Sequence, residues 1–119
     1  MQYEIKQSGK FKYVQEGSGE SLVLLHGLFG ALSNFKDLVD CFKEKYTVYI
    51  PMLPLYDLTN FDTSVSGLAK HVAKFITAKK LNNVHLLGNS LGGHIALVYA
   101  LAHPETVKTI TLTGSSGLF

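Results

Sequence analysis

The stretch Val84-His85-Leu86-Leu87-Gly88-Asn89-Ser90-Leu91-Gly92-Gly93-His94-Ile95-Ala96 decides how this chain folds. A short apolar run leads into a Gly-x-Ser-x-Gly pattern, and a helical apolar pattern follows it. This order predicts a strand, a sharp turn and a helix, with Ser90 at the turn in a strained backbone conformation. Gly88 and Gly92 suit such a turn because they lack a Cβ atom and so allow the strand and the helix to approach closely.

Ser90 itself has two interpretations. A serine on such a turn projects its hydroxyl above the edge of the sheet, and the next helix points free N–H groups toward it, which stabilises negative charge there. In this setting Gly-x-Ser-x-Gly is the nucleophile-elbow pattern. In the alternative, the segment is a glycine-rich turn in which Ser90 is only the N-cap of the helix.

Composition indicates a globular chain and disfavours several function classes. The 119 residues are enough for one domain, and 46% of them are hydrophobic while 17% are charged. The formal net charge of +2 comes without a basic run, which argues against nucleic-acid binding. We expect no membrane partner, because no apolar run is long enough to span a bilayer and Met1–Lys6 does not resemble a signal peptide. The single Cys41 excludes a disulfide scaffold and favours a cytoplasmic location.

The rest of the chain alternates between strand and helix patterns. The predicted strands are a hairpin of Gln2–Gln7 with Phe11–Glu16, then Ser21–Leu25, Tyr46–Ile50, Val84–Leu87 and Val107–Thr113. The predicted helices run from a cap at Ser33 or Asn34 to about Glu44, from a cap at Asp62, Thr63 or Ser64 to about Lys80, and from Leu91 to about His103.

This alternation predicts an α/β fold: a mostly parallel sheet with helices on both faces and an N-terminal β-hairpin. Active sites of such sheets lie at the carboxyl ends of the strands. His26-Gly27 and Ser90 both follow a predicted strand directly, so we expect them at that edge.

Two motifs resemble those of the α/β-hydrolase-fold superfamily, which includes esterases, lipases, C–C bond hydrolases, dehalogenases and cofactor-free haloperoxidases. His26-Gly27-Leu28-Phe29-Gly30 is similar to the His-Gly loop after the family's third strand, and Gly88-Asn89-Ser90-Leu91-Gly92-Gly93 is similar to its nucleophile elbow. The resemblance covers essentially all of the chain but only about the first half of a typical member. It implies that residues 1–119 are the N-terminal portion of a single hydrolase domain.

The resemblance also implies roles for individual residues. Ser90 matches the nucleophile, and the backbone N–H groups of Leu91 and Leu28 match the oxyanion-hole donors, with Phe29 as the fallback for Leu28. His26 matches a histidine that braces the oxyanion loop. The implied reaction is hydrolysis of a small-molecule ester or related acyl substrate without metal or cofactor. Serine at the position where dehalogenases carry aspartate argues against dehalogenation, whereas a C–C bond hydrolase or haloperoxidase stays open.

The chain departs from the family's order of serine, acid and histidine. The residues left for the last two roles are Glu105, His94, His103, Asp57 and Asp62. His94 would project sideways from the helix of Ser90, and His103 would lie three turns along it, too far to act as the base. We therefore expect the acid, the base, the lid and the last strands outside this chain, in cis or on a second chain, and expect residues 1–119 alone to be inactive.

Two other function classes remain as alternatives. A non-catalytic binding protein on the same scaffold would keep the turn for packing alone. A nucleotide-binding domain is disfavoured, because Gly88-x-Ser90-x-Gly92 has neither the Gly-x-Gly-x-x-Gly nor the P-loop spacing.

Overall fold

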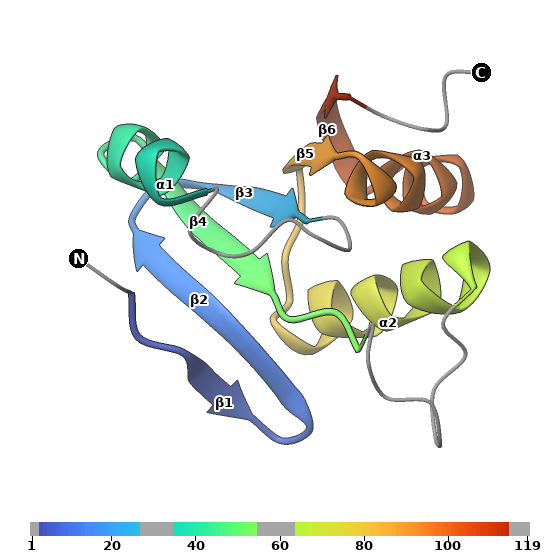
Figure 1. Cartoon of the computed structure of the whole chain (residues 1–119), viewed down its shortest axis with the longest axis horizontal. Coiled ribbons are helices and arrows are strands. Elements are labelled where there is room, and N and C mark those ends of the chain that lie inside the picture. Colours follow the sequence, from blue (N-terminus) through green and yellow to red (C-terminus); the bar gives the residue numbers. More distant parts are fainter. Residues whose placement is uncertain (1–2, 27–34, 55–63, 115–119) are drawn as a thin grey trace.

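A six-stranded sheet forms the centre of the molecule in a computed structural model that describes residues 3–26, 35–54 and 64–114 (Figure 1). The order of strands across the sheet is β1-β2-β4-β3-β5-β6. The strands are β1 (Lys6–Ser8), β2 (Phe11–Gly17), β3 (Glu20–Leu25), β4 (Tyr46–Pro51), β5 (Val84–Asn89) and β6 (Val107–Thr113).

Strand direction agrees with the sequence prediction. The four strands β4, β3, β5 and β6 are parallel neighbours, while β1 pairs with β2 and β2 with β4 in antiparallel fashion. Strand β3 lies at the middle of the parallel part, and its last four residues are all buried. Burial on both faces explains why Leu22–Leu25 is a continuous apolar run rather than an alternating one.

Helices cover both faces of the sheet, as predicted. The short helix α1 (Lys36–Phe42) packs on one face, and α2 (Val65–Ala78) and α3 (Leu91–Ala102) pack on the other (Figure 1). Alternate residues of β3 supply the two cores: Leu22 and Leu24 face α1, whereas Val23 and Leu25 face α2 and α3. The sequence therefore specified the α/β class, the N-terminal hairpin and the layering correctly.

Several element boundaries differ from the prediction. Strand β5 continues to Asn89 rather than ending at Leu87, because Asn89 still pairs with Thr113 of β6. Helix α1 begins at Lys36 with Phe35 at the N-cap position and no side-chain cap; the predicted caps Ser33 and Asn34 lie outside the described residues. Of the three predicted caps of α2, Ser64 is the N-cap in the structure.

Strand β6 is an edge of the described sheet, and most of its residues are exposed. A polar network, which the sequence did not reveal, joins the start of β6 to β3 and β5. The His85 ring nitrogens lie 2.7 Å from Thr109 Oγ1 and 2.9 Å from Glu20 Oε1, which also accepts a hydrogen bond from Lys108 Nζ at 3.0 Å. Hydrogen bonds from His85 and Lys108 lower the pKa of Glu20. The network lies at the amino ends of the strands, away from the edge where Ser90 lies.

Candidate active site at the turn between β5 and α3

Ser90 is the single residue between β5 and α3, and its backbone is strained. Its φ of 57° and ψ of −121° lie in a region that residues with a side chain rarely adopt, which costs on the order of 1–3 kcal/mol. Both of its backbone polar groups are paired. Its N–H donates to the Thr113 carbonyl at 2.9 Å, and its carbonyl accepts from Gly93 N–H at 2.9 Å. The surrounding backbone therefore holds the turn in a conformation that Ser90 would not adopt alone.

Gly88 and Gly92 allow this turn for the reason that the sequence suggested. A Cβ on Gly88 would lie 2.5 Å from the Gly92 carbonyl oxygen and 2.6 Å from Gly93 Cα. A Cβ on Gly92 would collide with the carbonyl group of Leu25, the last residue of β3. The start of α3 thus packs directly on the backbone of two parallel strands, and no larger residue fits there without displacing them.

The Ser90 side chain is exposed and does not cap its helix. The same chain provides a comparison in Ser64, which has an extended backbone and accepts a hydrogen bond from Gly67 N–H at 3.0 Å through Oγ. Ser90 occupies the equivalent position of α3 with a positive φ and makes no such bond. The N-cap interpretation of Ser90 is therefore wrong for its hydroxyl.

His26 ends the described part of the chain after β3. Its Nε2 accepts a hydrogen bond from Leu53 N–H at 3.4 Å, which joins the segment after β3 to the segment after β4. A histidine that braces the loop after β3 would make a contact of this kind. Leu28 and Phe29, the two candidates for one oxyanion donor, lie outside the described residues. Leu91, the other candidate, is the first residue of α3, where no earlier helical carbonyl can accept its N–H.

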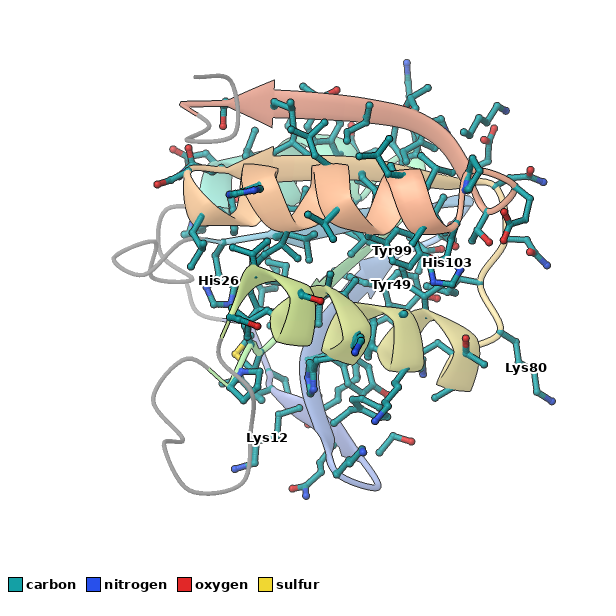
Figure 2. The ribbon with its side chains drawn as sticks, turned by 90° about the vertical axis from the view of Figure 1, so that its right-hand side faces the viewer. Lys12, His26, Tyr49, Lys80, Tyr99 and His103 are labelled. Atoms are coloured by element: carbon teal, nitrogen blue, oxygen red, sulfur yellow. The ribbon has the colours of Figure 1, made fainter. Side chains whose placement is uncertain are left out.

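Of the candidates for acid and base that the structure describes, His103 and Glu105 lie far from Ser90. His103 is the C-cap of α3, about 18 Å along the helix from its start. Its ring stacks on Tyr99 at 4.9 Å, and its Nδ1 lies 3.8 Å from Glu105. Figure 2 places His103 and Tyr99 at the opposite end of the α2–α3 layer from His26. His94 is half-buried one turn into α3, and Asp57 and Asp62 lie outside the described residues.

Other chemistry is sparse in the part of the chain that the structure describes. Residues 3–26, 35–54 and 64–114 contain no group of three or more His, Cys, Asp or Glu side chains that could hold a metal ion. Within the same ranges, every helix is too short or too polar to cross a membrane. Burial, aided by the charge of Lys10, lowers the pKa of His71 on α2, and burial raises the pKa of Tyr99 on α3. The arrangement thus offers one exposed serine on a strained turn.

Comparison with known proteins agrees with this geometry. The sequence model of the alpha/beta hydrolase fold family matches residues 20–118, which is most of the chain. The chain belongs to the α/β-hydrolase family. The solved structure of MGS-MChE2, an alpha/beta hydrolase enzyme from the metagenome of lagoon sediments at Mar Chica, Morocco, superposes with a TM-score of 0.92. This hydrolase is 50% identical in sequence, over 97% of the present chain and 53% of its own.

Curated relatives of this α/β-hydrolase chain include named lipases. Lipase 1 of Psychrobacter immobilis is 32% identical over 92% of the present chain and 37% of its own length. A monoacylglycerol lipase of Xenopus laevis is 27% identical over 99% of the present chain and 38% of its own. The chain therefore spans well under half the length of these relatives. The similarities support a hydrolase of this fold.

Proposed function

We propose that the protein containing this chain is a serine hydrolase of ester or related acyl bonds, with Ser90 as the nucleophile. The observation that carries the proposal is the state of Ser90: it is exposed, sits on a strained turn at the carboxyl end of β5, and leaves its own helix uncapped. A strained backbone that is held by its surroundings is typical of functional sites. The similarity to lipases favours an acyl ester as substrate.

In the proposed reaction, Ser90 Oγ attacks the acyl carbonyl carbon and its proton passes to a histidine. The resulting oxyanion accepts hydrogen bonds from the N–H groups of Leu91 and Leu28, whose fixed dipoles stabilise it. When the tetrahedral intermediate collapses, the alcohol leaves with the proton from the histidine. Water then attacks the acyl-enzyme and releases the acid, with the histidine again moving the proton. No metal or cofactor takes part in this proposal.

The histidine and the acid that orients it are proposed to lie outside this chain. Residues 1–119 would then be the N-terminal portion of one hydrolase domain, completed in cis or by a second chain. The proposal accounts for the positions of His103 and Glu105, which cannot serve Ser90 from the far end of α3. A serine without a neighbouring base is a weak nucleophile, so the isolated chain would turn over esters poorly.

The test is covalent labelling of the full-length protein with a fluorophosphonate, which reacts with activated serines. We expect labelling that Ser90→Ala abolishes and that Ser64→Ala leaves unchanged, since Ser64 is the capping serine of α2. A folded full-length protein that never labels, or that labels equally in the Ser90→Ala variant, would contradict the proposal.

A non-catalytic binding protein on this scaffold is the second candidate. It is favoured by one observation: apart from His94, the carboxylate and histidine side chains that follow Ser90 within the described residues are His103 and Glu105, at the far end of α3. Turnover of a short-chain ester such as p-nitrophenyl acetate by the native full-length protein separates the two functions. A C–C bond hydrolase or haloperoxidase would share the turn and would be recognised by labelling without ester turnover.

A further inference from the structure

We propose that Thr113 and Asn89 are positioning residues for Ser90, an inference that rests on the function proposed above. Thr113 is the last residue of β6, and Asn89 is the last residue of β5. Neither side chain is part of the proposed chemistry. Their effect on the reaction would come through the direction in which the turn presents Ser90.

Thr113 makes two hydrogen bonds to two consecutive residues of the turn. Its carbonyl accepts from Ser90 N–H at 2.9 Å, and its hydroxyl donates to Asn89 Oδ1 at 3.0 Å. Thr113 and Asn89 are also direct partners in the parallel pairing of β6 with β5. At Gly114 the backbone turns into a positive φ of 54°, so the chain leaves the strand immediately after these bonds are made.

The first bond holds the N–H of the peptide unit between Asn89 and Ser90, and the second holds the side chain of Asn89, the residue that precedes this unit. The conformation of Ser90 depends on how this peptide plane is oriented, because φ is the rotation about the bond from the Ser90 nitrogen to its Cα. A positive φ in a non-glycine residue relaxes toward negative values unless something opposes the rotation. The N–H bond to the Thr113 carbonyl opposes it directly. The hydroxyl bond to Asn89 keeps the Thr113 end of β6 in register with the turn.

Two substitutions at position 113 distinguish the effect of the Thr113 hydroxyl from the effect of the β6 backbone. Thr113→Val keeps the shape and the backbone carbonyl but removes the donor to Asn89, whereas Thr113→Ser keeps the donor. A neutral hydrogen bond of this kind is worth about 1 kcal/mol, so we expect Thr113→Val to lower kcat about fivefold with KM unchanged. Thr113→Ser should have the same kcat as the wild type. Thr111→Val, the same change on the same face of β6 two residues earlier, is the matched control and should leave kcat unchanged.

The experiment measures the rate constant of fluorophosphonate labelling and the kcat for p-nitrophenyl acetate in the full-length protein, each per folded molecule. If the wild type does not label at Ser90, the proposed function fails. If it labels and Thr113→Val labels and turns over at the wild-type rate, only the positioning inference fails. An equal loss in Thr113→Ser or Thr111→Val would also overturn the inference, since the hydroxyl would not be the cause.

Asn89 provides an independent variant pair in case Thr113→Val does not fold. Asn89→Ala removes the acceptor, whereas Asn89→Asp keeps an oxygen in its place. We expect Asn89→Ala to lower kcat about fivefold, as for Thr113→Val, and Asn89→Asp to recover at least half of that loss. In the Asn89→Ala background, Thr113→Val should have no further effect on kcat, because the bond it removes is already gone. Additive losses would show that the two side chains act separately and would refute the inference.

Discussion

Gly92→Ala is the change for which two ordinary rules predict opposite signs. Gly92 is the second residue of α3, and alanine stabilises a helix relative to glycine by about 1 kcal/mol. Helix propensity alone therefore predicts a more stable protein. The packing at this position predicts the reverse, because a Cβ on Gly92 would collide with the carbonyl of Leu25 at the end of β3.

The nature of the obstacle determines which effect is larger. Overpacking in a core costs about 1–3 kcal/mol, and the low end applies where a flexible side chain can move aside. Here the neighbour is the backbone of Leu25, which pairs with Gly88 of β5 and cannot yield without disturbing that strand. Taking about 3 kcal/mol for the clash and about 1 kcal/mol for the helix gain, we expect the free energy of unfolding to fall by about 2 kcal/mol.

Urea denaturation of the wild type and the Gly92→Ala variant measures this difference. The control for helix propensity is the pair Ser66→Ala and Ser66→Gly, because Ser66 is exposed and is the second residue of α2, as Gly92 is of α3. In that pair alanine should be the more stable by up to about 1 kcal/mol. A Gly92→Ala variant at least as stable as the wild type would refute the claim that α3 begins in backbone contact with β3.

Two further predictions concern the layer between the sheet and α2. Burial lowers the pKa of His71 below its ordinary value of 6.5, so the unfolded chain takes up the proton more readily and stability should fall as the pH drops through that value. Compared with the wild type, His71→Gln should show a smaller loss of unfolding free energy between about pH 7.5 and pH 5.5; parallel profiles would contradict this. Phe75 is fully buried against the rings of Phe11, Tyr13 and Tyr49. Phe75→Ala should lower the free energy of unfolding by about 3–5 kcal/mol, measured by thermal or urea unfolding. A loss below about 1 kcal/mol would be inconsistent with that packing.

Local sequence patterns sufficed to predict the fold because each one reflects burial over a few neighbouring residues. The run Leu22–Leu25 is apolar because both of its faces are covered. The apolar residues of α2 recur at helical spacing because that helix buries one face. The role of Gly88 and Gly92 could also be predicted locally, because close packing at the turn leaves no room for a Cβ. The ends of the elements were predicted less accurately. Strand β5 continues to Asn89 because it pairs there with β6, which lies elsewhere in the sequence.

The parts of the candidate site that escaped prediction depend on distant residues. Thr113 is an ordinary β-branched residue in its own segment, and only the pairing of β6 with β5 brings it to Ser90. Outside the site, the network of Glu20 and His85 likewise joins residues 65 positions apart. Leu28 was assigned by resemblance and lies outside the described residues, so its role stays a prediction.

The hydrogen bonds between the ends of β5 and β6 also set an order of events during synthesis. The ribosome adds Asn89 and Ser90 well before Thr113, which follows Asn89 after 24 residues. Until then the nascent chain has no acceptor for the Ser90 amide in this arrangement, and the bend would be free to relax. The strained conformation of Ser90 would therefore form late in translation, after the strand that secures it has emerged from the exit tunnel.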